Sequence, residues 1–276
     1  MTAPKVAIIA GRGLLPTLIA RSLEAQGTPF VLAQMQGFVA DNPGGWPVET
    51  FRIEQLAPLF DRLAALDVAQ VIFAGAVQRP QVDPQTIDPK TAALLPRLLP
   101  AFQTGDDSLL RAVIGLFEEA GFAVVGTADI APDLLAGEGV LTKAQPSEAE
   151  RADADRAAKI VGVLGREDIG QGAVVAGGLC VAVETLPGTD AMLGFVAGLD
   201  YQRAANGARG VFFKAPKPGQ DRRIDLPTIG PDTIEACAKA GIAGLAIEAG
   251  GVLMLDRDAL LARADALGLF IWGRPA

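Results

Sequence analysis

The chain has 276 residues, half of them apolar, and a formal net charge of −8, which argues against general nucleic-acid binding. Its length allows one large domain or two modest ones. The absence of histidine excludes Ser-His-Asp and Cys-His catalysis and every histidine-ligated metal site, so an enzyme built from this chain must use carboxylates, lysine, arginine and backbone N–H groups.

The first part of the chain is predicted to alternate strands with helices. Lys5–Ala10 is a continuous apolar run, typical of a strand that is buried on both faces, and a helix over Pro16–Gln26 follows it. The alternation continues with strands at Phe30–Gln34, Val71–Phe73 and Phe122–Val125 and helices at Leu56–Leu66 and Ser108–Ala120. This order predicts an α/β domain over 1–131, a Rossmann-like parallel sheet with helices on both faces that binds a nucleotide or an anion.

The second part of the chain has a different pattern. Residues 132–147 are rich in glycine, proline and charge, so we expect an interdomain linker there. Residues 148–276 mix parallel and antiparallel signals, which predicts a separate α+β domain. Its expected elements are a helix from Glu148 to about Leu164, a hairpin over Ala173–Glu184, a helix from Thr189, a strand at Gly210–Lys214, a helix at Pro231–Ala240, a strand at Gly244–Glu248, a hairpin over Gly250–Leu255 and a helix at Arg257–Leu267.

Targeting and redox signals are weak in this sequence. It has no run of about 18 apolar residues, the length that a membrane-spanning helix needs. The N-terminal segment reads as a buried first strand and not as a secretory signal. Cys180 and Cys237 lie far apart without a partner motif, which fits a reducing cytosol and argues against a structural zinc site.

Two glycine-containing turns follow predicted parallel strands and therefore share the carboxyl edge of the first sheet. Gly11, Arg12 and Gly13 open the first helix, where N–H groups can approach an anion. The turn lacks the third glycine of a dinucleotide fingerprint, so a purely structural turn, an anion site and an NAD site all remain open. Gly75 and Arg79 follow the later strand, and Gly75 either contacts a ligand or relieves crowding.

Two further pairs of residues stand at helix starts. Asp106 and Asp107 either cap a helix or hold a divalent cation, depending on whether they face the cleft. Thr189 and Asp190 either cap the next helix or belong to a phosphate site in which Thr189 donates its hydroxyl.

The segment Val211–Pro231 contains closely spaced cationic and acidic residues. Cations that suit phosphate oxygens alternate there with carboxylates that suit Mg²⁺ or Mn²⁺. The alternative is a solvated charged loop. The residues that we single out are Lys214, Lys217, Gln220, Asp221, Arg223 and Asp225. Asp225 is the acid nearest to Arg223 and to the Leu226-Pro227 turn, in which proline restrains the preceding residue to an extended conformation.

These motifs resemble the LpxI-type UDP-2,3-diacylglucosamine pyrophosphatases of lipid A biosynthesis. The resemblance rests on Ile9–Pro16, Gly105–Leu110, Gly188–Leu193 and above all Lys214–Gly230, and it extends over essentially the whole chain. It implies a Gram-negative bacterial hydrolase that uses a divalent metal to split UDP-2,3-diacylglucosamine into UMP and 2,3-diacylglucosamine 1-phosphate (lipid X), with the lipid held between two domains. It also implies a homodimer.

Together, the motifs and the resemblance predict a site. Asp225, Lys214, Arg223 and Asp221 are the expected catalytic residues, and Asp225, Asp106 and Asp107 are the expected ligands of Mg²⁺ or Mn²⁺, with no organic cofactor. The expected substrate contacts are Gly11, Arg12, Gly13, Gly75, Arg79, Thr189, Asp190, Lys217 and Gln220. We expect a cytoplasmic protein with peripheral contact to the inner membrane and no nucleic-acid partner. The competing hypotheses are an NAD-dependent oxidoreductase and a non-catalytic nucleotide-sugar or lipid-binding protein.

Overall fold

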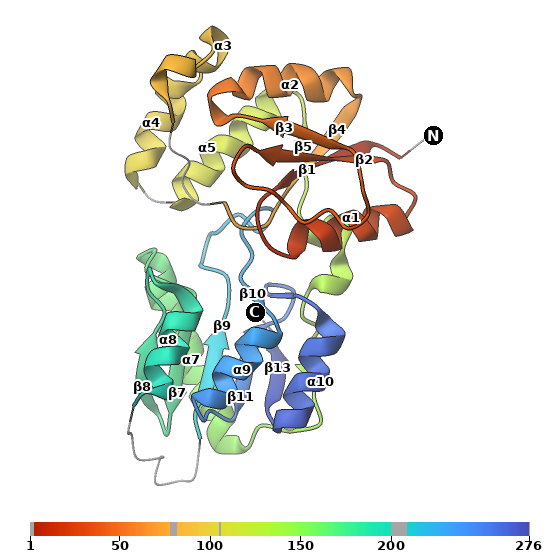
Figure 1. Ribbon diagram of the computed structural model, residues 1–276. Helices are drawn as coiled ribbons and strands as arrows, with labels where there is room; N and C mark the ends of the chain where they lie inside the picture. The colour runs from red at the N-terminus through yellow and green to blue at the C-terminus, as the bar shows by residue number, and fades with distance from the viewer. Residues whose placement is uncertain (1–2, 78–81, 105, 200–208, 276) are drawn as a thin grey trace. The chain divides into compact units, whose positions relative to one another are not determined.

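The computed structural model describes residues 3–77, 82–104, 106–199 and 209–275 (Figure 1). The chain divides into two compact units, Met1–Pro132 and Asp133–Ala276. None of the helices in these described ranges has the length and apolar character that crossing a membrane requires.

The N-terminal unit is built on a parallel sheet of five strands in the order β3-β2-β1-β4-β5. This is the strand order of the Rossmann fold, so the predicted parallel α/β domain is confirmed. The elements are β1 (Lys5–Ala10), α1 (Leu15–Ala25), β2 (Phe30–Met35), β3 (Val48–Phe51), η1 (Ile53–Gln55), α2 (Leu56–Ala65), β4 (Val68–Ala74), η2 (Pro84–Thr86), α3 (Pro89–Ala92), α4 (Leu95–Thr104), α5 (Asp106–Glu119), β5 (Ala123–Val124) and α6 (Thr127–Ile130).

Helices cover both faces of this sheet. In Figure 1, α1 lies on one side of the strands and α2 on the other. On the α2 side the core is aromatic: the ring of Phe117 from α5 lies 4.9 Å from that of Phe60 in α2 and 5.2 Å from that of Phe73 in β4, both in edge-to-face geometry. Strand β3 was not predicted, because its four residues, VETF, are only partly buried and lack a long apolar run.

The C-terminal unit contains a mixed sheet of six strands in the order β6-β13-β11-β9-β7-β8. Strands β9, β11 and β13 are parallel, and β6, β7 and β8 run antiparallel to their neighbours, so the predicted mixed α+β character is confirmed. The elements are η3 (Pro132–Leu134), β6 (Gly139–Val140), α7 (Glu148–Arg166), β7 (Gly172–Ala176), β8 (Leu179–Val183), α8 (Gly188–Ala197), β9 (Val211–Lys214), β10 (Thr228–Ile229), α9 (Pro231–Lys239), β11 (Gly244–Glu248), β12 (Leu253–Met254), α10 (Arg257–Leu267) and β13 (Phe270–Arg274).

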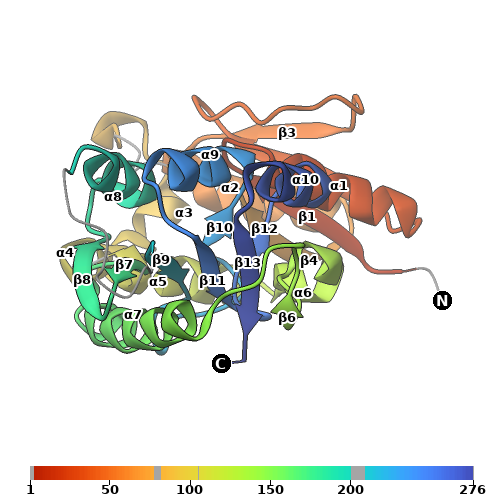
Figure 2. The ribbon, with the colours of Figure 1, turned by 90° about the horizontal axis from the view of Figure 1, so that it is seen from below.

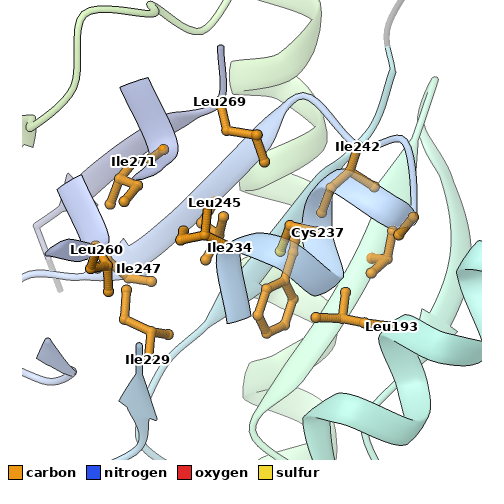
Figure 3. Packing of buried hydrophobic residues seen from close by; sticks show 14 of the residues in the cluster. Leu193, Ile229, Ile234, Cys237, Ile242, Leu245, Ile247, Leu260, Leu269 and Ile271 are labelled. Atoms are coloured by element: carbon orange, nitrogen blue, oxygen red, sulfur yellow. The ribbon is translucent and has the colours of Figure 1, made fainter. Parts of the chain in front are cut away.

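The C-terminal unit has three layers. Helix α7 covers one face of the sheet, and α8, α9 and α10 cover the other (Figure 2). On the three-helix side, Leu193, Ile234 and Leu260 contribute to one continuous apolar cluster with Leu245 and Ile271 of the sheet (Figure 3). All five side chains are fully or almost fully buried, so the hydrophobic effect stabilises the packing of the three helices on this face of the sheet.

Two expectations about the second part of the chain need correction. The segment Gly250–Leu255 is not a hairpin: β12 instead pairs in parallel with β10, and Leu253 donates its backbone N–H to the Pro227 carbonyl at 2.9 Å. The expected linker, 132–147, contains η3 and β6, and β6 pairs with β13 in the C-terminal sheet. Most of this segment therefore belongs to the C-terminal unit by its backbone hydrogen bonds.

Candidate functional site

The charged segment that the sequence singles out connects β9 to β10 and lies at the carboxyl end of β9. Arg222 forms an ion pair at 2.7 Å with Glu248, the last residue of the neighbouring parallel strand β11. Lys217 forms an ion pair with Asp168, which follows α7. The segment is thus fixed across the edge at which parallel α/β sheets bind their ligands.

Lys214 is the most buried ionisable group of this segment. It ends β9, whose four residues are all buried, and only 7% of its surface is exposed. Its ammonium donates hydrogen bonds to Thr189 Oγ1 at 2.8 Å and to the Thr228 carbonyl at 3.1 Å. Burial lowers the pKa of Lys214, while the negative charges of Glu184, Asp190 and Asp225 act in the opposite direction.

Thr189 links Lys214 to Glu184, a carboxylate to which the sequence analysis assigns no role. The hydroxyl of Thr189, in the first turn of α8, accepts from Lys214 and donates to Glu184 Oε2 at 3.1 Å. Glu184 directly follows β8. Its position five residues before Thr189 is the sequence feature that could have indicated this contact. Asp190 lies beside Thr189 in the same turn and is exposed.

Asp225 and Gln220 lie together in the loop. Gln220 donates from Nε2 to Asp225 Oδ2 at 2.9 Å and also to the backbone carbonyl of Asp225. The other end of the Gln220 amide accepts from the Lys217 backbone N–H at 2.9 Å. Gln220 therefore closes the loop on itself and orients the exposed carboxylate of Asp225.

Arg223 and Asp221 form a second pair in the loop. The guanidinium of Arg223 donates to Asp221 through Nε at 2.9 Å and through Nη2 at 2.7 Å. A forked pair of this kind fixes the plane of the guanidinium. Asp221 therefore orients the Arg223 side chain.

In the N-terminal unit, the turns after β1 and β4 contact each other directly. Arg12 and Ala76 exchange two backbone hydrogen bonds of 2.9 Å, and the Gly11 N–H donates to the Ala74 carbonyl at 2.8 Å. A Cβ at Gly11 would lie 2.6 Å from the Ala76 oxygen, and Gly75 has a φ of +90° with equally little room. Close backbone packing therefore requires both glycines.

This packing changes what the first turn can offer a ligand. The N–H groups of Gly11 and Arg12 are already used, so an anion would have to reach donors from Gly13 onward. The Arg12 side chain extends to the turn after β2, where it donates to the Gly37 carbonyl at 3.2 Å and lies over the Phe38 ring. The carboxyl edge of the sheet is thus assembled from three turns, and substrate binding by Gly11, Arg12, Gly13 and Gly75 remains a prediction.

We expect Gly11→Ala to destabilise the N-terminal unit by roughly 1–3 kcal/mol, because the added methyl meets backbone that cannot move alone. Chemical denaturation of the full chain would measure the loss. Gly115→Ala in α5 is the matched control: its Cβ would make only an ordinary contact, at 4.0 Å from Arg97 Nη2, and alanine should add about 0.5–1 kcal/mol of helix stability. Equal stability of Gly11→Ala and the unmodified protein would contradict the packing role.

Some predicted site residues fall outside what the structure describes. Arg79 lies outside the described residues, as do the side chains of Asp106 and Asp107 at the start of α5. Among the acidic and cysteine residues that are described, no three lie close enough together to form a metal cluster. The predicted ligation by Asp106, Asp107 and Asp225 therefore remains a prediction.

A hollow of about 220 Å³, with a mostly apolar lining that includes Gly188 at the start of α8, lies in the C-terminal unit. Its lining comes from β8, from the turn before α8 and from α8 itself, and includes Pro187, Met192 and Phe195. Leu186, in that turn, is 96% exposed and Phe195 is 59% exposed. Exposed apolar side chains therefore lie in the hollow's lining and in the adjacent turn.

Comparison with known proteins identifies the family. The LpxI N-terminal domain matches residues 5–134, and the LpxI C-terminal domain matches residues 137–272. The chain belongs to the LpxI family. A curated relative in this family, UDP-2,3-diacylglucosamine pyrophosphatase LpxI from Caulobacter vibrioides (strain ATCC 19089 / CIP 103742 / CB 15), is 41% identical over 271 residues, which cover 98% of this chain and 97% of the relative.

Solved structures add no functional information to the LpxI assignment. CobK precorrin-6A reductase is 16% identical with a TM-score of 0.33, covering 100% of this chain and 89% of that one. An isoflavone reductase is 13% identical with a TM-score of 0.27, covering 100% of this chain and 79% of that one. Likenesses this low carry no argument about activity.

Proposed function

We propose that this chain hydrolyses the pyrophosphate bond of UDP-2,3-diacylglucosamine, giving UMP and 2,3-diacylglucosamine 1-phosphate in lipid A biosynthesis. The observation that carries the proposal is the 41% identity, over 98% of the chain, to a curated LpxI pyrophosphatase. The buried Lys214 and the ordered Asp225 loop at a sheet edge support it, because phosphoryl transfer needs positioned cations and a carboxylate.

In this proposal the residues of the C-terminal unit have separate catalytic roles. Water attacks phosphorus, the P–O bond to the bridging oxygen breaks, and the carboxylate of Asp225 either positions the metal or accepts the proton of the water. The ammonium of Lys214 has three N–H donors, and its two hydrogen bonds to Thr189 and Thr228 leave one for a phosphate oxygen, as far as the described residues show. Arg223 and Lys217 supply further positive charge at the pyrophosphate.

Divalent metal dependence is part of the proposal. Mg²⁺ binds through one or two carboxylates plus substrate phosphates, so the exposed Asp225 fits it without a dense acidic cluster. Asp225 would hold the ion, and Asp106 and Asp107 are the other acids that we assign to it. A bound Mg²⁺ or Mn²⁺ would neutralise charge on the phosphoryl oxygens. We propose no organic cofactor.

The acyl chains of the substrate need an apolar surface. We assign one of them to the hollow along α8, because its lining includes Gly188, the neighbour of Thr189 in the polar cluster. With a phosphate at Lys214, the glucosamine ring, which carries both the phosphate and the acyl chains, would lie between Lys214 and this hollow. We further propose a cytoplasmic homodimer that contacts the inner membrane peripherally through exposed apolar side chains such as Leu186.

Incubation with UDP-2,3-diacylglucosamine, with and without a chelator, tests the proposal by mass spectrometry of the products. We expect UMP and the sugar 1-phosphate in equal amounts, and their loss on chelation. In ¹⁸O-labelled water, the attack at the β-phosphorus that we expect from the resemblance would place the label in the sugar phosphate, and attack at the α-phosphorus would place it in UMP. Bound but intact substrate would favour a binding protein, and oxidation or reduction of NAD would favour the oxidoreductase; either result would overturn the proposal.

A further inference from the structure

The structure places Glu184 beside Lys214 through two independent features. The first is the hydrogen-bond relay in which Lys214 donates to Thr189 and Thr189 donates to Glu184. The second is the register of the sheet, in which Gly172 of β7 is the cross-strand partner of Lys214, while the Glu184 backbone N–H donates to the Gly172 carbonyl at 2.8 Å.

Gly172 provides the space that the Glu184 side chain occupies. A Cβ at Gly172 would lie only 2.7 Å from Glu184 Oε2 and 2.8 Å from the Phe212 ring. The carboxylate therefore folds over Gly172, the cross-strand partner of Lys214, which carries no side chain. Any larger residue would displace Glu184 from Thr189.

We infer that Glu184 is a positioning residue of the proposed pyrophosphatase: it holds Thr189 so that the hydroxyl accepts from Lys214, and thereby aims the ammonium at the phosphate. Glu184 touches neither the substrate nor the reacting atoms in this role. The inference rests on the proposed function, because aiming Lys214 matters only if Lys214 meets a phosphate.

Electrostatic interactions with Lys214 support the same assignment. Among the described residues, the ionisable groups that act on Lys214 are Glu184 after β8, Asp190 in α8, Asp225 in the loop and Cys237 in α9. Burial lowers the pKa of Lys214 and the negative charge of Glu184 opposes that shift. Removing the Glu184 charge should therefore let the Lys214 ammonium lose its proton at a lower pH.

Glu184→Ala tests the inference, because alanine removes both the acceptor for Thr189 and the charge. We expect kcat/KM to fall roughly 10- to 100-fold, as for a displaced catalytic group, and the alkaline limb of its pH profile to move to lower pH. Glu184→Gln keeps an acceptor for Thr189 but removes the charge, so it should move the alkaline limb and lose less of kcat/KM. Glu184→Asp keeps the charge and should leave the limb close to its original position. Glu235→Gln, a surface acid on α9, is the matched control and should change neither quantity.

Two further measurements keep the inference open to refutation. A ¹³C NMR titration of the lysine side chains, with Lys214 assigned by its loss in Lys214→Met, reads its pKa without substrate. The pKa should fall in Glu184→Gln and in Thr189→Val, and the double variant Glu184→Ala, Thr189→Val should lose little more kcat/KM than either single variant. An unchanged pKa, or fully additive losses of kcat/KM, would overturn the inference. A lowered pKa in a protein that does not hydrolyse UDP-2,3-diacylglucosamine would overturn only the proposed function.

Discussion

Asp225→Ala should lower turnover at least about a hundredfold while substrate still binds, the range expected when an acid–base group or metal ligand is removed. Asp225 is exposed and is oriented by Gln220 at 2.9 Å, so the carboxylate is available to a substrate and has a defined direction. Because binding contacts come from other residues, the dissociation constant should change little. Single-turnover kinetics and isothermal titration with substrate would measure the two effects separately.

A disordered loop would also lower turnover in Asp225→Ala. A second variant separates this effect from the loss of the catalytic carboxylate. Asp225→Asn keeps an oxygen that can accept from Gln220 but carries no charge, so the loop should keep its hydrogen bonds. It should lose turnover as severely as the alanine variant. Asp258→Ala, an exposed acid in the first turn of α10, should be neutral. Near-normal turnover of either Asp225 variant in folded protein would remove Asp225 from the mechanism.

Lys214→Met should lower kcat/KM by roughly 10- to 150-fold, which corresponds to about 1.5–3 kcal/mol for one charge-assisted hydrogen bond. The reason is that a rigid strand end directs this ammonium, so another flexible side chain cannot replace it. Methionine fills a similar volume and removes the cost of burying a charge, so the fold should survive. Steady-state kinetics on the full chain would measure the loss, and Lys239→Met on the exposed face of α9 is the control.

The lowered pKa of Lys214 determines the direction in which activity and stability change with pH. Burial lowers the pKa of Lys214 below its ordinary value of 10.5, so the ammonium loses its proton earlier than an exposed lysine does. The alkaline limb of kcat/KM should therefore fall below that pH, and Lys214→Arg should move the limb upward because guanidinium stays charged. Between the folded and unfolded pKa values the unfolded chain binds more protons, so stability should rise with pH across that window. Activity that persists unchanged in Lys214→Met would refute the role.

The long periodic segments of this chain could be predicted from the sequence. The bounds predicted for β1, β11 and α10 are those observed, and the alternation of strand and helix led to the parallel N-terminal sheet. Local information suffices there, because each segment buries a face that its own apolar pattern defines. The family resemblance, which the comparisons confirm, likewise depended on a contiguous string, Lys214–Gly230.

Tertiary structure alone decided the short strands and the polar cluster. Strands β6, β10 and β12 have two residues each, too few for any periodicity, and they form because distant backbone groups need partners. Lys214 and Thr189 are 25 residues apart, and only the β7–β9 register with the turn into α8 brings Glu184 to them. The sequence by itself determined which groups carry charge and which segments are buried. Which charge meets which depends on long-range strand pairing, whose partners no local pattern encodes.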